Sequence, residues 1–314
     1  MRIALLCALA LLVASASCAR RAPADRADTP GDATAATIAS PDADANGAND
    51  AAEPERAPLA GFPLQMDLVG PSDEDGGGAA KTRTSTKLGV VAVPLGAREP
   101  RPIMVALHGG SDHPEWACTA WRGITNGYPF VVCPRGVGAS DAALGWSSPA
   151  DTKARVARAI AAVKKIFGAT WVREAPVVLL VGFSMGATQA ALLAQGDPRT
   201  YARVALAESA YAPEPVMTFA GPWGAGGGER ALLLCTTKGC EAPYRNAARN
   251  VAAHHGRARL NIAGTSEHGM WDEVVRSMRR DWPWLVEGVA GWETYSPPVE
   301  DSPLPGKTET FDPR

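Results

Sequence analysis

Residues 177–193 read VVLLVGFSMGATQAALL, and this stretch determines the class of fold. It begins with valine and leucine, which favour a buried strand, and its second half, from Ala187 onward, favours a helix. Between the two lies GFSMG, residues 182–186, with the spacing G-x-S-x-G. Glycine on both sides lets a strand and a helix approach without Cβ clashes, so the spacing predicts a sharp turn that projects the Ser184 hydroxyl. The alternative is a structural serine in a glycine-rich turn.

Outward from this stretch, short apolar runs alternate with helical patterns. Buried strands are predicted at residues 88–93, 103–107, 130–133, 177–182, 204–207, 232–235 and 259–262. Helices are predicted after Asp151 (as a capping residue), after Ser184, and over residues 242–254 and 268–280. Strands that alternate with helices predict an α/β fold, a mainly parallel sheet with helices on both faces.

The composition excludes several classes of protein. The chain has 314 residues, with 31 Lys and Arg against 33 Asp and Glu and a formal net charge of -2. Phosphate recognition needs a basic surplus that is missing here, so a nucleic-acid partner is not expected. Hydrophobic residues make up 46% and charged residues 20% of the chain, which excludes collagen, a coiled coil and complete disorder.

The N-terminus has the pattern of a secretory signal peptide, predicted as residues 1–17. Arg2 precedes an apolar run over residues 3–13, which is too short for a membrane span, and small residues follow. One interpretation places cleavage after Ala16. In the other, residues 15–18 (SASC) resemble the bacterial lipobox, in which the cysteine, here Cys18, is lipidated; that pattern usually has Leu or Val where Ser15 stands.

Cysteine arithmetic favours the lipobox. Removal of Cys7 with the signal leaves Cys18, Cys118, Cys133, Cys235 and Cys240. An odd number in an oxidising compartment leaves one cysteine over if four pair, and lipidation of Cys18 uses it. The protein is therefore expected to be exported and lipid-anchored at the bacterial cell envelope, with a periplasmic or secreted protein as the alternative. Metal is not expected, because no C-x-x-C or H-x-x-x-H accompanies the cysteines.

The pairing itself is a hypothesis, because four cysteines allow three connectivities. The favoured pairs are Cys118 with Cys133 and Cys235 with Cys240. Residues 18–85 are predicted to form a disordered tether, because residues 19–60 are rich in Ala, Asp, Pro, Thr and Asn, and residues 72–80, with three glycines, have the pattern of a loop. The folded domain is expected over residues 86–292, and the proline-rich residues 293–314 are expected to form a flexible tail.

A second motif, LHGGS at residues 107–111, follows the apolar run 103–107. With GFSMG it resembles the α/β-hydrolase family, and the overall look is of esterases of the dienelactone-hydrolase and polyhydroxybutyrate-depolymerase type. The resemblance covers about residues 86–291. It implies an oxyanion hole formed by the backbone N–H of Met185 and of Gly110 or Ser111, with His108 structural and no cofactor.

The resemblance also orders the remaining groups as nucleophile, acid and base along the chain. His268 follows the last predicted strand and is expected to be the base, whereas His254 and His255 lie on an Arg-rich helix and are expected to be solvated. The acid usually follows the strand at 232–235, but the loop there contains no Asp. Glu241 is the nearest carboxylate, and Glu208, at the end of the strand 204–207, is the runner-up.

These features predict a serine hydrolase with an acyl-enzyme on Ser184, expected to cleave a small-molecule or polymeric ester. Thioesterases, peptidases and acyltransferases share the same set of residues. The membrane is expected as a partner only through the lipid anchor. The segment between Glu208 and Leu232 is too short for a large helical lid, so an open site is expected. Five tryptophans are predicted near it, either to stack on substrate or to pack the sheet: Trp116, Trp121, Trp146, Trp223 and Trp271. The alternative function, motivated by the irregular acid loop, is a non-catalytic surface lipoprotein that acts as a binding module.

Overall fold

A computed structural model describes residues 56–70, 87–138, 140, 143–209, 218–264 and 267–313. The chain divides into residues 1–51, outside this described part, and residues 52–314, to which the following refers. The strands are β1 (Gln65–Val69), β2 (Lys87–Ala92), β3 (Ile103–Leu107), β4 (Phe130–Pro134), β5 (Leu179–Phe183), β6 (Arg203–Ala207), β7 (Arg230–Cys235), β8 (Arg257–Ile262) and β9 (Lys307–Phe311). The helices are α1 (Pro114–Ile124), α2 (Pro149–Trp171), α3 (Met185–Gly196), α5 (Ala220–Ala225), α6 (Lys238–Ala253) and α7 (Asp272–Val286).

The strands form one sheet in the order β1-β2-β4-β3-β5-β6-β7-β8-β9. Neighbouring strands from β4 through β3 and β5 to β8 run parallel. Antiparallel pairing is limited to β1 and β2 at one edge and to β9 at the other. The prediction of a mainly parallel sheet is confirmed.

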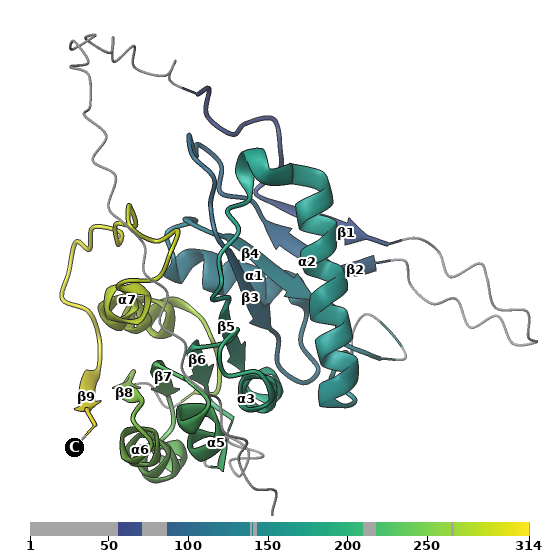
Figure 1. The fold of residues 1–314 in the computed structure, drawn as a ribbon. Helices are drawn as coiled ribbons and strands as arrows, with labels where there is room; N and C mark the ends of the chain where they lie inside the picture. The colour runs from purple at the N-terminus through teal and green to yellow at the C-terminus, as the bar shows by residue number, and fades with distance from the viewer. Residues whose placement is uncertain are drawn as a thin grey trace, which may run out of the picture. The chain divides into compact units, whose positions relative to one another are not determined.

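Helices cover both faces of the sheet (Figure 1). Because successive residues of a strand point to opposite faces, each central strand contributes side chains to two cores. In β3, Val105 and Leu107 pack into the core beneath α2, α3, α5 and α6. Met104 and Ala106 of the same strand pack into a second core, beneath α1 and α7. The central strands are buried on both sides, which explains their continuous apolar sequence. One detail differs from the expectation: Ser148, and not Asp151, caps α2, by accepting a hydrogen bond from the Asp151 amide.

Both predicted domain boundaries differ from the structure. Strand β1 lies inside the segment expected to be a tether, and Leu68 within it is fully buried. Strand β9 lies inside the expected tail, where it pairs with β8. Its sequence, KTETF, lacks an apolar alternation, so side chains from the helices hold it: Thr308 donates to buried Asp281 at 2.6 Å. The signal peptide, Cys18 and most of the predicted tether lie outside the described residues.

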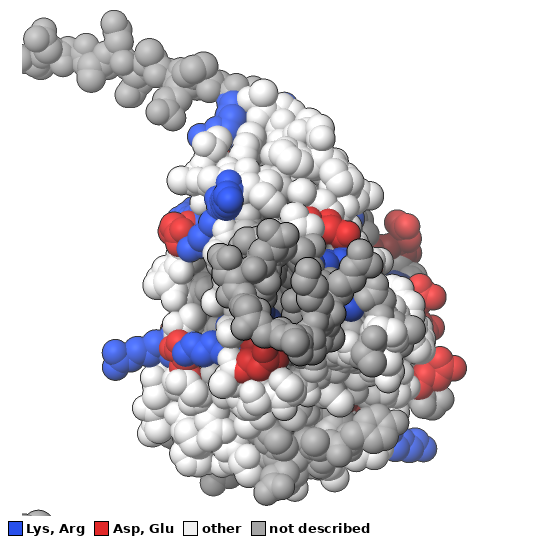
Figure 2. Space-filling view, turned by 90° about the vertical axis from the view of Figure 1, so that its right-hand side faces the viewer, with Lys and Arg blue, Asp and Glu red and all other residues white. Residues whose placement is uncertain are grey.

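Two disulfides join the cysteine pairs favoured from the sequence. Cys118 of α1 is bonded to Cys133 of β4, and Cys235 of β7 is bonded to Cys240 of α6. Disulfides are typical of proteins in oxidising, extracytoplasmic compartments. Within the described residues, no helix is both long and apolar enough to cross a membrane. On the face in Figure 2, described cationic and anionic side chains are interspersed, and neither sign forms a continuous patch.

Candidate active site

Ser184 lies on the turn between β5 and α3, where the sequence places it. Its backbone has φ 53° and ψ −121°, a conformation that few non-glycine residues adopt. The flanking glycines make room for this turn. A Cβ on Gly182 would lie 2.4 Å from the Gly186 oxygen, and one on Gly186 would lie 2.2 Å from the Leu107 oxygen. Strand, helix and the end of β3 therefore approach closely only because both positions are glycine.

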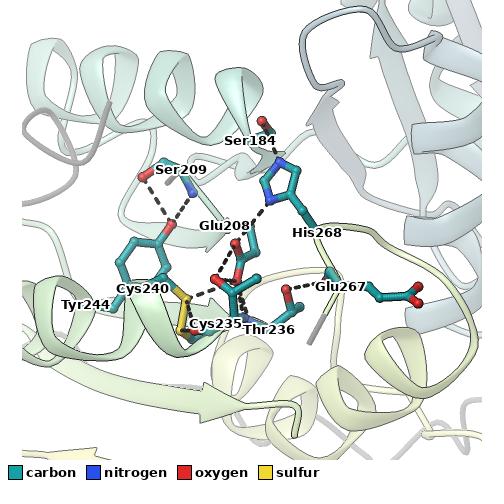
Figure 3. A network of polar contacts seen from close by, with 10 residues as sticks. Ser184, Glu208, Ser209, Cys235, Thr236, Cys240, Tyr244, Glu267 and His268 are labelled. Atoms are coloured by element: carbon teal, nitrogen blue, oxygen red, sulfur yellow. Dashed lines mark hydrogen bonds and ion pairs between the residues drawn. A yellow bond between two sulfur atoms is a disulfide. The ribbon is translucent and has the colours of Figure 1, made fainter. Parts of the chain in front are cut away.

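His268 joins Ser184 to a carboxylate (Figure 3). Its Nε2 lies 3.0 Å from Ser184 Oγ, and its Nδ1 lies 3.1 Å from Glu208 Oε2. A carboxylate only accepts hydrogen bonds, so Nδ1 carries the proton and Nε2 keeps a lone pair directed at the serine hydroxyl. The ring packs against Phe183, with centroids 4.8 Å apart. The imidazole is thus held in the orientation in which it can take a proton from Ser184.

Glu208 is fully buried at the end of β6. Its Oε1 accepts hydrogen bonds from the backbone N–H groups of Thr236, at 2.5 Å, and Thr237, at 2.8 Å. Burial raises the pKa of Glu208, but the hydrogen bonds from His268, Thr237 and Thr236 outweigh it, and the pKa lies below its ordinary value. The side chain is therefore ionised at neutral pH.

The structure does not bring Glu241 to His268. Glu241 lies in the first turn of α6, and its carboxylate is 3.6 Å from Arg245. The contact expected of Glu241 is made by Glu208, the runner-up. The loop between Cys235 and Cys240 contributes two backbone amides to the site, whereas the carboxylate of Glu241, just after Cys240, faces Arg245. The only sequence signal for Glu208 is a carboxylate directly after a buried strand.

Besides Thr237, sequence reasoning missed three residues that support this carboxylate. Thr236 ties the acid loop to the loop that carries the base, because its hydroxyl donates to the Glu267 carbonyl at 2.7 Å. Ser209 follows Glu208, and its N–H donates to the Tyr244 hydroxyl at 2.6 Å. Burial raises the pKa of Tyr244, so it stays protonated and donates in turn to Ser209 Oγ at 3.1 Å. These are non-local contacts that no short sequence motif reports.

The residues expected to form the oxyanion hole differ in whether their backbone N–H already donates a hydrogen bond. Met185 is the first residue of α3, where a backbone N–H has no partner within the helix. Gly110 lies against it, since a Cβ on Gly110 would be 3.1 Å from Met185 Cε. In contrast, the Ser111 N–H donates to the Leu144 carbonyl at 2.7 Å. Of the two alternatives, Gly110 therefore has the amide that remains available beside Met185.

Side chains hold the LHGGS loop from behind. His108 is fully buried; its Nε2 accepts from the Gly136 N–H at 3.0 Å, so its Nδ1 donates to the Gly109 carbonyl at 2.7 Å. Burial lowers the pKa of His108, which keeps this ring neutral. Trp146 Nε1 donates to the His108 carbonyl at 2.9 Å. His108 thus has the structural position that the resemblance implies. His254 and His255 lie at the end of α6, away from the cleft described next.

A cleft of about 770 Å³ opens above Ser184 and His268. Trp116, Trp121 and Trp271 line it, as the sequence suggested. The other two tryptophans do not line the cleft. Trp146 supports the LHGGS loop, and Trp223 is fully buried in the core beneath α2, α3, α5 and α6.

The carboxylate of Glu208 and the sulfurs of Cys235 and Cys240 lie close enough together to suggest a metal site. The two sulfurs are bonded to each other, so neither is a thiolate that could ligate an ion. The cluster is a disulfide beside a carboxylate, with Cys240 Sγ 3.0 Å from Glu208 Oε1.

This sheet order, with a serine on a tight strand-to-helix turn after β5, defines the α/β-hydrolase fold, and the chain has this fold. No family model and no curated protein matches the sequence. Three solved structures of similar backbone are esterase PE8, the protein TT1662 of Thermus thermophilus, and pOPH.

The similarity to each of these structures is distant. Esterase PE8 is 14% identical, with 60% of this chain and 94% of that chain covered and a TM-score of 0.42. TT1662 is 16% identical, with 63% and 93% covered and a TM-score of 0.43. For pOPH the identity is 14%, the coverage 71% and 89%, and the TM-score 0.45. The function proposed below rests on the geometry of the site alone.

Proposed function

We propose that the protein is a serine hydrolase that cleaves carboxylic esters, with Ser184 as nucleophile, His268 as base and Glu208 as the acid that orients the base. The observation that carries this proposal is the position of His268, hydrogen-bonded at once to Ser184 Oγ and to the buried Glu208 carboxylate. A nucleophile, a base and an orienting carboxylate in hydrogen-bond reach are the components of acyl transfer through a covalent intermediate.

In the first half of the reaction, Ser184 Oγ attacks the carbonyl carbon of the ester while its proton passes to His268 Nε2. The carbonyl oxygen becomes an oxyanion that accepts hydrogen bonds from the N–H groups of Met185 and Gly110. Glu208 stabilises the positive charge on the imidazolium. The bond to the alcohol oxygen then breaks, and the alcohol leaves with the proton from His268.

The second half repeats these steps with water. His268 takes a proton from a water molecule, which attacks the acyl group on Ser184, and the same two amides hold the new oxyanion. When the bond to Ser184 Oγ breaks, Ser184 recovers its proton from His268 and the carboxylic acid is released. The residues of this chain supply every proton transfer, so the proposed reaction needs no cofactor.

The test is labelling of the purified domain with a fluorophosphonate probe, which reacts covalently with activated serines. We expect wild-type protein to be labelled and Ser184→Ala to remain unlabelled. A folded, disulfide-bonded wild type that takes no label and hydrolyses no short-chain ester would contradict the proposal. That result would favour the alternative of a non-catalytic binding module.

We also propose that the protein is exported and anchored by a lipid on Cys18. The signal-like residues 1–17 and the pairing of the four downstream cysteines with one another support this proposal. Metabolic labelling with palmitate is expected to mark the wild type and not Cys18→Ser. Equal labelling of both would rule out the anchor and leave a periplasmic or secreted protein.

A further inference from the structure

The wall of the cleft above Ser184 is mainly apolar. Its large apolar side chains come from α1, from β5 and the start of α3, and from the loop before α7: Trp116, Trp121, Phe183, Met185, Met270 and Trp271. Such a wall, with a few polar groups at one point, is typical of a site that binds an organic molecule. Here the polar groups gather around the nucleophile.

Two of these side chains are unusually exposed for tryptophan. Trp116 is 63% exposed and Trp271 is 53% exposed, and Met185 between the nucleophile and the LHGGS loop is 43% exposed. No other tryptophan among the described residues belongs to the exposed large apolar side chains. Large apolar groups that stay in water around one cleft indicate a surface that a ligand covers.

Each exposed ring packs against one neighbouring residue. The imidazole of His113 packs on Trp116, with ring centroids 4.4 Å apart. The ring of Trp271 lies over Gly269, where a Cβ would be 2.0 Å from the indole. A glycine next to the base is thus required for this ring position. Rigid aromatic faces bind with little loss of side-chain entropy, which favours stacking on a flat partner.

The charged side chains that line the cleft also restrict which substrates can bind. No Lys or Arg lies among the described residues that line the cleft, and its one carboxylate is Asp112. Both Asp112 oxygens face backbone donors: Oδ2 accepts from the Gly109 N–H at 3.0 Å and Oδ1 from the His113 N–H at 2.7 Å. A second carboxylate, brought by a substrate, would meet a like charge and no cation.

We infer that the substrates are uncharged esters with an aromatic or comparably bulky apolar group that stacks on Trp116 and Trp271, and that esters with a free carboxylate are excluded. This inference rests on the proposed function. It makes the two tryptophans specificity-determining residues, distinct from the groups that carry out the reaction.

The charge requirement is tested with two esters that differ by one carboxylate. Diethyl adipate and monoethyl adipate have the same acyl chain and the same ester bond, and only the second is an anion at pH 7.5. We expect kcat/KM for the diester, per ester bond, to exceed that for the monoester by about tenfold or more. Equal values would overturn the exclusion of carboxylates.

The stacking requirement is tested with Trp116→Ala and Trp271→Ala on ethyl 3-phenylpropanoate and ethyl acetate. We expect each variant to raise KM for the aromatic ester about tenfold more than KM for ethyl acetate, with kcat little changed, and Trp→Phe to restore most of the loss. Leu64→Ala is the matched control, because Leu64 is also an exposed apolar side chain (54% exposed) but lies outside the cleft. Equal KM changes for both esters would overturn the stacking role.

Calorimetric binding of ethyl 3-phenylpropanoate to Ser184→Ala, with and without Trp271→Ala, separates this inference from the proposed function. Weaker binding in the double variant supports the aromatic site even if turnover is slow. If the wild type takes the fluorophosphonate label but the tryptophan variants behave as wild type in both assays, the inference fails and the serine hydrolase stands. If the wild type takes no label and binds no ester, both fail.

Discussion

The neighbouring strands β5 and β6 end with the same backbone conformation, but only the end of β5 has a recognisable sequence motif. Ser184 follows β5 with φ 53°, and Glu208 follows β6 with φ 52°. The Ser184 N–H donates to the Ala207 carbonyl at 2.8 Å, and the Glu208 N–H donates to the Leu234 carbonyl at 3.0 Å. Each side chain reaches His268 (Figure 3). A strained residue at the end of a parallel strand is therefore used twice, once for the nucleophile and once for the carboxylate.

What differs is the set of residues next to each side chain. Helix α3 begins at Met185 and packs so closely that Gly186 contacts the end of β3. Glu208 lies between Ala207 and Ser209, with no glycine on either side, and the Ser209 amide is bonded to Tyr244 of α6. The glycines of GFSMG thus report the packing of a helix on a strand, and not the strained backbone itself. For this reason the nucleophile has a motif and the acid has none.

The largest expected effects are losses of kcat, and they should differ between the residues at the two strand ends. Ser184→Ala removes the nucleophile and should lower kcat by about 10⁶-fold, whereas Glu208→Gln should lower it by about 10⁴-fold. The smaller loss is expected because the introduced amide fills the same space but offers His268 the wrong hydrogen-bond partner, while the nucleophile and oxyanion donors remain. Steady-state hydrolysis of a short-chain ester measures both.

Glu241→Gln is the control for that comparison. Its carboxylate faces Arg245 on the surface of α6, so we expect kcat within about twofold of the wild type. A loss in Glu241→Gln comparable to that in Glu208→Gln would show that the two carboxylates exchange roles when the protein works. Normal activity in both variants would remove the carboxylate from the mechanism.

The same contrast explains how much the sequence could predict. The strands β3 and β5, the turn at Ser184 and the position of His268 follow from local patterns, because apolar runs and glycine spacing report packing between adjacent segments. Glu208 and β9 depend on contacts between distant segments. Glu208 is held by His268 and by the amides of Thr236 and Thr237, which are all distant in sequence. Strand β9 is held by side chains of α6 and α7 despite its polar sequence.

Two glycine substitutions on α3 test whether the motif reports helix packing. Gly186→Ala places a methyl group against the backbone of Leu107 and should lower the free energy of unfolding by about 3 kcal/mol. Gly196→Ala, at the other end of the helix, meets open space and should change stability by less than about 1 kcal/mol. Urea unfolding followed by tryptophan fluorescence measures both. Equal effects would mean that close approach is not the reason for glycine at 186.

The two disulfides should also differ in their effect on activity, because only one of them closes the loop that holds Glu208. Cys235 and Cys240 close the loop whose amides hold Glu208, and replacing both with Ala should lower the free energy of unfolding by about 2 kcal/mol and kcat by about tenfold. Replacing Cys118 and Cys133 opens a longer loop away from the acid, with a stability loss of about 3 kcal/mol. Activity of that variant, measured at a temperature where it is folded, should stay near the wild type. If both variants lose activity in proportion to stability, the acid loop has no special dependence on its disulfide.

The smallest expected effect is the pH dependence of stability contributed by Glu208. Burial raises its pKa, but the hydrogen bonds from His268, Thr237 and Thr236 bring the pKa in the folded protein below the ordinary value. A carboxyl group of this kind stabilises the fold above its unfolded pKa, and the contribution is lost as the pH falls through its folded pKa. The stability difference between wild type and Glu208→Gln should therefore be constant above about pH 5 and shrink at more acidic pH. Gly196→Ala changes no titratable group and should show a flat difference over the same range. A difference for Glu208→Gln that is equally flat would mean that the ionised carboxylate, with its two amide donors, adds nothing to the stability of the strand end on which it lies.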